Sequence, residues 1–168
     1  MLEIFNDLKP FFENNYRRIN VREYARLRRI SPPSASKLLE SLHKEHLLKK
    51  ETEKNYIYYS ADNANKPFID LSKTYWFIEL SELIEYIEKE YTAPLVILFG
   101  SFAKAEVKEN SDIDIAIFTS SNKTLNINKF EKKLRHTIQL FQFKNREGVK
   151  NPELLNNIFN GFIMAGSW

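Results

Sequence analysis

Two short segments carry the residue types that phosphate chemistry requires. The first is Gly100-Ser101, which directly follows the continuous apolar run 95–99. The second contains Asp112 and Asp114, which alternate with isoleucines. Because residues two apart in a strand point to the same face, the two carboxylates are expected to lie side by side. Such a pair can hold a divalent cation through its oxygen atoms.

A glycine–serine turn that leaves a strand and opens a helix offers amides and a hydroxyl to a phosphate. Mg²⁺ commonly uses one or two carboxylates together with substrate phosphates. The two segments therefore predict binding of a nucleoside triphosphate with Mg²⁺ or Mn²⁺, aligned for in-line attack. We expect Asp112 and Asp114 to be catalytic and to bind the metal. The residues expected to bind the nucleotide are Gly100, Ser101, Lys104 and Ser111.

The neighbouring segments are expected to position these residues. The runs 95–99 and 111–118 have strand character, and 127–135 reads as a helix leading into a further strand at 136–143. A helix at 67–90 precedes them and carries two apolar stripes. These stripes leave alternatives open: burial against both domains, burial against a second subunit, or one wide core-facing side.

The first third of the chain predicts a different kind of module. An amphipathic segment spans 2–12, although Pro10 argues against one uninterrupted helix. Asn20 is suited to cap a short helix ending near 28–29, and Ser31 to cap a second helix that runs to about residue 44. Strand-like runs at 47–50 and 56–59 then enclose a polar turn. Two short helices followed by a hairpin indicate a winged helix-turn-helix.

The charge distribution favours nucleic acid as the partner of this module. Residues 1–60 hold 12 Lys and Arg against 8 Asp and Glu, whereas the remainder holds 13 against 14. In a helix-turn-helix, the second helix presents its N-terminal residues to the bases of duplex DNA, while basic side chains reach phosphates. The alternative is a protein-docking role. The residues expected to contact DNA are Arg26, Arg28, Arg29, Ser34, Ser36, Lys37, Lys49 and Lys54.

Both modules resemble known families. The segments 20–27 and 31–42 are similar to winged-helix regulators of archaea and bacteria. Gly100-Ser101-Phe102-Ala103-Lys104-Ala105 followed by Ser111-Asp112-Ile113-Asp114 resembles the signature of minimal nucleotidyltransferases with a polymerase-β-like domain. The combination resembles a mostly archaeal group of nucleotidyltransferases. The resemblance implies an α/β (α+β) protein, in which a winged helix precedes a small domain with a mixed sheet flanked by helices.

Two positions depart from the nucleotidyltransferase pattern. Ala105 stands where the family has glycine. Active members usually carry a third carboxylate on a later strand, but the run 136–143 contains no acid, and Gln139 is the expected occupant of that position. Glutamine can ligate a metal through its oxygen but cannot act as a general base. Whether the chain is an active enzyme is therefore left open.

Composition excludes several classes of protein and of functional site. The chain has no cysteine, so it has no disulfide scaffold and no thiol nucleophile. No window resembles a membrane span, and the N-terminus lacks the pattern of a signal peptide, so we expect a cytoplasmic protein without membrane partners. The predicted organisation is a winged helix at 1–62, a connecting helix at 63–92 and a nucleotidyltransferase domain at 93–168.

These observations support one leading function and two alternatives. The leading function is Mg²⁺-dependent transfer of a nucleoside monophosphate from a nucleoside triphosphate to an acceptor hydroxyl, coupled to DNA binding. The first alternative is a catalytically impaired regulator that senses nucleotide. The second is an antitoxin-like partner of a small helical toxin, with the apolar stretch 154–163 as the contact unless that stretch is core. A homodimer is also left open.

Overall fold

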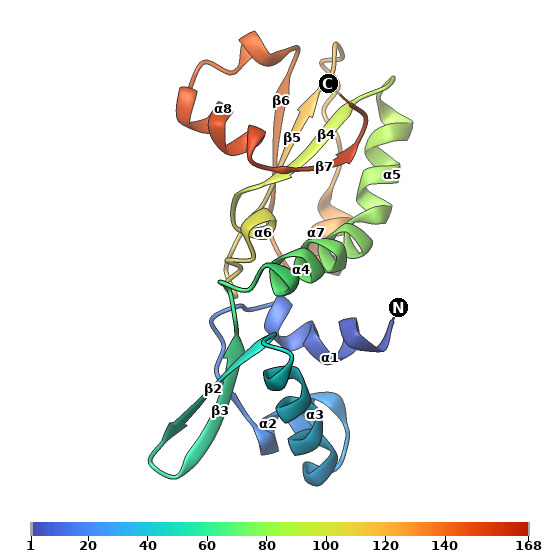
Figure 1. Cartoon of the computed structure of the whole chain (residues 1–168). Coiled ribbons are helices and arrows are strands. Elements are labelled where there is room, and N and C mark those ends of the chain that lie inside the picture. Colours follow the sequence, from blue (N-terminus) through green and yellow to red (C-terminus); the bar gives the residue numbers. More distant parts are fainter. Residues whose placement is uncertain (1, 168) are drawn as a thin grey trace. The chain divides into compact units, whose positions relative to one another are not determined.

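A computed structural model describes residues 2–167, which form two compact units of helices and sheets (Figure 1). Unit 1 comprises the chain up to Ser72 together with Ala105–Glu109, and unit 2 comprises Lys73–Lys104 and the chain from Asn110 onward. The predicted mixed α/β class is confirmed. None of the helices within residues 2–167 combines the length and apolar character that crossing a bilayer requires.

The division between the units differs from the predicted boundaries at 62/63 and 92/93. It falls inside helix α4 (Lys66–Glu79), and the short segment 105–109 belongs to unit 1. Asn15 explains why the segment 105–109 belongs to unit 1. Its backbone N–H donates to Val107 O at 2.8 Å, and its Oδ1 accepts from Val107 N at 2.6 Å. Asn15 is 1% exposed, so this connection is shielded from water.

Helix α1 (Glu3–Phe12) runs without interruption through Pro10, contrary to the expectation from sequence. A proline inside a helix costs about 3 kcal/mol because it removes a hydrogen bond and its ring crowds the preceding turn. Here the apolar face offsets that cost, since Leu8, Phe11 and Phe12 are fully buried. Each such side chain contributes about 1.5–3 kcal/mol through burial.

Helices α2 (Val21–Arg28) and α3 (Pro32–Lys44) begin at the predicted caps. Asn20 Oδ1 accepts from Glu23 N at 3.0 Å, and Ser31 Oγ accepts from Ser34 N at 3.3 Å. Both bonds satisfy amides that have no partner within their helix. Arg29, between the helices, takes the left-handed conformation at φ 54° and turns the chain from α2 into α3.

Strands β2 (Leu48–Glu53) and β3 (Tyr56–Ala61) form the predicted hairpin, but they are longer than expected. The turn needs only Lys54 and Asn55, both in the left-handed region at φ 46° and 68°. Two consecutive residues of this kind match the twist of antiparallel strands. A further short strand, β1 (Ile19–Asn20), pairs with β3 and completes a sheet in the order β1-β3-β2.

Unit 2 is built on a mixed sheet in the order β6-β5-β4-β7. Strand β4 (Leu95–Phe99) lies antiparallel to β5 (Ile113–Phe118) and to β7 (Phe162–Ala165), whereas β5 and β6 (Ile138–Phe143) are parallel. The parallel pair is joined through α7 (Asn128–Leu134), as predicted. Every residue of β4 is buried, because helices cover both faces of this strand.

The predicted helix at 67–90 is two helices, α4 and α5 (Ser81–Glu90). The helix is interrupted at Leu80, which is fully buried. Ser81 Oγ donates to Ile78 O at 2.8 Å across this interruption. The break redirects the second apolar stripe, so that α5 buries Leu83, Ile84 and Ile87. In Figure 1, α5 and α8 (Pro152–Phe159) lie on opposite sides of the unit 2 sheet.

Helix α8 shows how the apolar C-terminal stretch is used. Ile158 is buried in a cluster with residues of β4 and β5, and Leu154 and Leu155 pack against it. Phe159 and Ile163 remain exposed, at 43% and 41%. Ile158 is therefore core, Leu154 and Leu155 are partly buried against it, and the rest of the stretch is partly or largely exposed.

Candidate nucleotide site

The glycine–serine turn lies at the end of β4, as the sequence predicts. Helix α6 (Gly100–Lys104) begins directly after Phe99, and Gly100 adopts φ 70°. This left-handed conformation favours glycine, because a side chain there meets the backbone. Ser101 is half-buried at the first turn of α6.

Asp114 lies against Gly100. Phe99 and Asp114 are register partners in the β4–β5 pair, so the carboxylate is next to the turn. A Cβ atom added at Gly100 would lie 2.2 Å from Asp114 Oδ2, closer than real Cβ contacts come. The absence of a side chain at Gly100 therefore provides the space that the carboxylate occupies, a relation that the spacing of the two motifs did not reveal.

Asp112 and Gln139 form the other side of the site. Asp112 lies just before β5, whose first residue is Ile113 rather than residue 111 as predicted. Gln139 is the register partner of Asp114 on β6, and its Nε2 donates to Asp112 Oδ2 at 2.6 Å. The structure thus brings together both carboxylates and the glutamine expected at the third position.

The electrostatics of the pair favour a cation. Burial, and then the negative charge of Asp112, raise the pKa of Asp114 above its ordinary value. No ion pair to Lys, Arg or His is found for either carboxylate within residues 2–167. Two adjacent carboxylates that lack a compensating charge are the oxygen-rich ligand set that Mg²⁺ binds. In the described part of the chain, no third His, Cys, Asp or Glu completes such a cluster.

His136 supports the segment that leads into Asp112. Its Nδ1 lies 2.8 Å from Ser111 O, and because a carbonyl can only accept, Nδ1 is the donor. The ring packs edge-on against Phe102 of α6 and against Trp76, with centroids 5.1 and 5.9 Å apart. No role was predicted for His136, and its position as the first residue of the predicted strand 136–143 was the available signal.

Lys104 is exposed at the end of α6. Its Nζ donates to Asn157 Oδ1 of α8 at 3.4 Å, a long hydrogen bond. The side chain is thus directed toward α8 here, and its predicted contact with a phosphate stays a prediction. Ser111 is half-buried, and its carbonyl is taken by His136.

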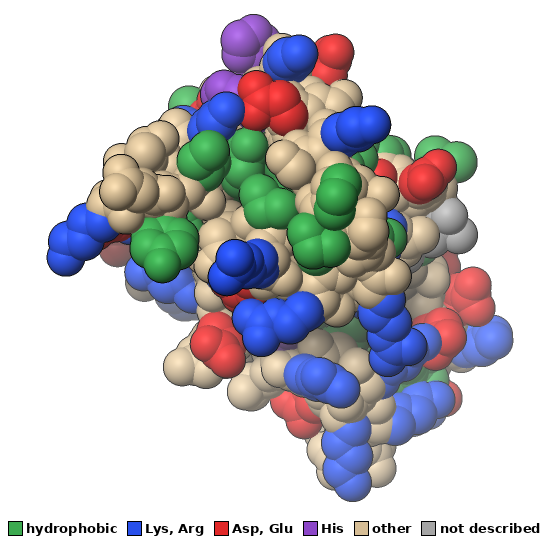
Figure 2. Space-filling model, turned by 90° about the horizontal axis from the view of Figure 1, so that it is seen from below, with side chains coloured by type: hydrophobic (Ala, Val, Ile, Leu, Met, Phe, Trp, Pro, Cys, Tyr) green, Lys and Arg blue, Asp and Glu red, His purple; other side chains and the backbone are tan. Residues whose placement is uncertain are grey.

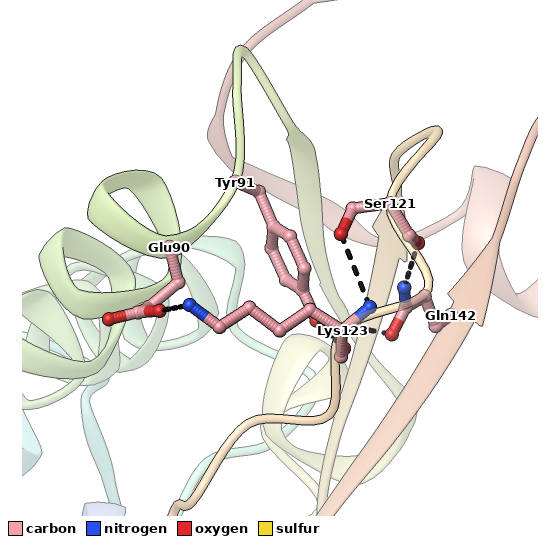
Figure 3. Close-up of polar contacts among 5 residues, drawn as sticks. All are labelled: Glu90, Tyr91, Ser121, Lys123 and Gln142. Atoms are coloured by element: carbon pink, nitrogen blue, oxygen red, sulfur yellow. Dashed lines mark hydrogen bonds and ion pairs between the residues drawn. The ribbon is translucent and has the colours of Figure 1, made fainter.

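The loop that joins β5 to α7 is fastened at the other end of these strands (Figure 3). Tyr91 Oη donates to Lys123 O at 2.6 Å, and Lys123 Nζ pairs with Glu90. Gln142 of β6 donates to Ser121 O, and Ser121 Oγ accepts from Lys123 N at 3.2 Å. Burial raises the pKa of Tyr91, which keeps its hydroxyl protonated as a donor. This network holds β6, the strand that carries Gln139.

Residues 81–164, half of the chain, match the family described as Polymerase beta, Nucleotidyltransferase. The chain belongs to this family. The matched range contains both carboxylates, the glycine–serine turn and Gln139 of the nucleotidyltransferase domain. No curated protein matches the chain in a sequence comparison.

Unit 1 lies mostly outside the residues matched by the nucleotidyltransferase family. Some of its basic residues are exposed, and others are held in ion pairs. Lys and Arg side chains gather on the face seen from the side of α2, α3 and the hairpin (Figure 2). Exposed side chains on this module include Arg26, Arg29, Ser36, Lys37 and Lys54. Ser34 is exposed too, with its hydroxyl 2.9 Å from that of Ser31.

Two of the residues predicted to contact DNA are occupied by ion pairs. Arg28 Nη2 lies 2.7 Å from Asp7 Oδ1, and Asp7 is almost fully buried. Lys49 Nζ lies 3.3 Å from Asp62 Oδ1. Both side chains thus have partners within unit 1, and the predicted contacts of Arg28 and Lys49 with DNA stay predictions.

Proposed function

We propose that unit 2 transfers a nucleoside monophosphate from a nucleoside triphosphate to an acceptor hydroxyl in the presence of Mg²⁺ or Mn²⁺. The observation that carries the proposal is the close packing of Asp114 on Gly100, beside Asp112 and without a compensating cation. That arrangement costs free energy in the isolated chain, because burial and like charge both disfavour the ionised Asp114. A bound cation would offset the cost.

The roles of the residues follow from their positions. Asp112 and Asp114 would hold the cation, which when bound neutralises charge on the triphosphate and on the developing transition state. The Gly100–Ser101 turn, at the start of α6, would bind phosphate oxygens through its amides and hydroxyl. Ser111 and Lys104 are the further candidates for the nucleotide.

Gln139 limits the rate at which such a site could transfer a nucleotide. Its amide donates to Asp112 and so orients one carboxylate, but an amide cannot take the proton of the attacking hydroxyl. Transfer would then rely on positioning and on charge neutralisation. The alternative role that this observation favours is a nucleotide-sensing regulator, in which the site binds nucleotide without turnover.

Transfer of labelled nucleotide tests the proposal. The full chain is incubated with Mg²⁺ or Mn²⁺ and a triphosphate labelled at either the α or the γ phosphate, with the protein, nucleic acids and small hydroxyl compounds as acceptors. We expect transfer of the α label alone, and its loss in Asp112→Asn/Asp114→Asn. The control Glu85→Gln/Glu88→Gln removes the same charge from exposed positions on α5 and should keep activity. Nucleotide binding without transfer would favour the regulator instead.

We further propose that unit 1 is a winged helix that binds double-stranded DNA. Three features support this: the capped helix pair, the exposed N-terminal side chains of α3, and the hairpin that follows. Few side chains on α3 suit bidentate base recognition, so affinity should come from phosphates with little sequence preference. Binding to unrelated duplexes should weaken together as salt rises. Absence of binding even at low salt would contradict this role.

A further inference from the structure

Most basic residues around the hairpin of unit 1 are already neutralised by ion pairs. Arg18 Nη2 lies 2.9 Å from Glu53 Oε2 and 3.4 Å from Glu51 Oε2, both on β2. Lys50 Nζ lies 2.8 Å from Glu40 Oε2, and Lys49 is paired with Asp62. Of the cations on the strands and turn, Lys54 alone has no ion pair within residues 2–167.

The side of unit 1 formed by α2 and the start of α3 is different. Arg22, Arg26, Arg29 and Lys37 have no ion pair within the described part of the chain, and all four are exposed. Arg22 and Arg26 are one helical turn apart, so their like charges repel each other on the same face of α2. The uncompensated positive charge of the module is therefore concentrated on this side rather than on the hairpin.

A concavity lies within this charged region. It has a volume of about 520 Å³ and is lined by Arg22, Ala25, Arg26, Ile30 and Pro32. The two guanidinium groups supply the charge, and the other three residues form an apolar wall. Pro32 contributes no backbone N–H, so this wall offers few groups that could hydrogen-bond a sugar hydroxyl.

We infer that this concavity seats the sugar–phosphate backbone of duplex DNA, and that the hairpin adds little to the affinity. The inference rests on the proposed DNA binding of unit 1. Arg22 and Arg26 bind phosphate oxygens, because the planar guanidinium matches a phosphate with two parallel hydrogen bonds. Ala25, Ile30 and Pro32 contact deoxyribose, which lacks the 2′-hydroxyl that would need a polar partner.

The turn between the helices places the concavity beside the predicted recognition surface. Pro32 is the first residue of α3, and Ser36 and Lys37 follow on its exposed N-terminal part. A backbone held by Arg22 and Arg26 would therefore run alongside the end of α3 that is expected to face the bases. Arg22, which the sequence analysis did not assign to DNA, becomes a principal contact.

The salt dependence of DNA binding tests the inference. Fluorescence anisotropy of a labelled duplex is followed between about 50 and 200 mM salt for the full chain and its variants, where each phosphate contact contributes about 0.9 to the log–log slope. Arg22→Ala/Arg26→Ala should lower the slope by about 2. The control Arg18→Ala/Lys50→Ala removes the same charge from paired cations and should leave the slope unchanged.

Two further arms complete the test. Arg22→Lys/Arg26→Lys keeps the charge and should retain the slope, while weakening the binding that depends on paired hydrogen bonds. Duplex RNA of the same sequence should bind more weakly than DNA. If the wild-type chain binds no DNA, the proposed role of unit 1 fails. If it binds and the control variant loses as much slope as the Arg22/Arg26 variant, this inference alone is overturned.

Discussion

Replacing Gly100 with alanine tests how closely the turn after β4 must approach Asp114. The new Cβ would lie 2.2 Å from Asp114 Oδ2, and opening this to an ordinary contact of 3.4 Å moves the carboxylate by about 1.2 Å. The φ of 70° adds strain of about 1–2 kcal/mol for a residue with a side chain. We expect stability to fall by at least that amount, because displacing the carboxylate adds a further cost to the backbone strain.

The effect on activity should be larger than the effect on stability. A displacement of about 1 Å in a reacting group can cost about 10²-fold in rate. We therefore expect Gly100→Ala to reduce nucleotide transfer about 100-fold, measured with the labelled triphosphate, while urea unfolding shows a folded protein. Affinity for the metal–nucleotide complex should fall as well.

Gly166 provides the matched control. It also has a positive φ, at 76°, but a Cβ there would meet Pro94 O at 2.5 Å and Leu95 Cα at 2.9 Å, which are backbone atoms outside the candidate site. Gly166→Ala should therefore cost at least as much stability while retaining activity in the folded fraction. Equal loss of activity in the two variants would refute the specific role of Gly100.

A double-mutant cycle isolates the contact itself. Asp114→Ala leaves a Cβ that is 3.4 Å from the Cβ built on Gly100, an ordinary separation. In the Gly100→Ala/Asp114→Ala variant the collision is gone and the backbone strain remains. The cost of Gly100→Ala should therefore be smaller in the Asp114→Ala background. An unchanged cost would show that Asp114 is not what Gly100 makes room for.

Three further predictions follow from named contacts. Arg28→Met leaves the buried Asp7 unpaired and should lower the free energy of unfolding by about 3 kcal/mol. Arg29→Met, at an exposed position, should change it little. Similar losses in both variants would contradict a stabilising role of the Arg28–Asp7 ion pair. In EDTA, Asp114→Asn should have a higher free energy of unfolding than the wild type at pH values above the raised pKa of Asp114. This difference should shrink as pH falls and Asp114 takes up a proton. A difference independent of pH would contradict burial and the charge of Asp112 as the cause of the raised pKa. Gln139→Glu supplies a carboxylate on the strand next to Asp114. If the missing general base limits the rate, this variant should raise Mg²⁺-dependent nucleotide transfer about 10²-fold. An unchanged rate would show that another step limits transfer.

The local elements could be predicted where a side chain or a run of residues determines the backbone. Asn20 and Ser31 cap α2 and α3 as expected, and the buried run 95–99 forms β4. The prediction for Pro10 was wrong because tertiary burial of the neighbouring aromatic residues outweighs the local preference. Propensity is a weak guide wherever packing decides.

Relations between distant segments were harder to predict. The bond between Asn15 and Val107 joins residues 92 positions apart, and no local pattern indicates it. Ala105 adopts φ 55° and is fully buried, so the family's glycine position keeps its left-handed backbone with a side chain present. The resemblance to the nucleotidyltransferases did indicate Gln139 as the occupant of the third position, and Gln139 is the register partner of Asp114.

A crystal structure with Mn²⁺ and a non-hydrolysable nucleoside triphosphate analogue tests the central claim most directly. The account predicts an anomalous peak within coordination distance of both Asp112 and Asp114, with the phosphates on the Gly100–Ser101 turn. The same map would show whether Gln139 turns its oxygen to the metal or keeps its amide on Asp112. A nucleotide bound elsewhere on the chain, or no peak between the two carboxylates at saturating Mn²⁺, would contradict the account.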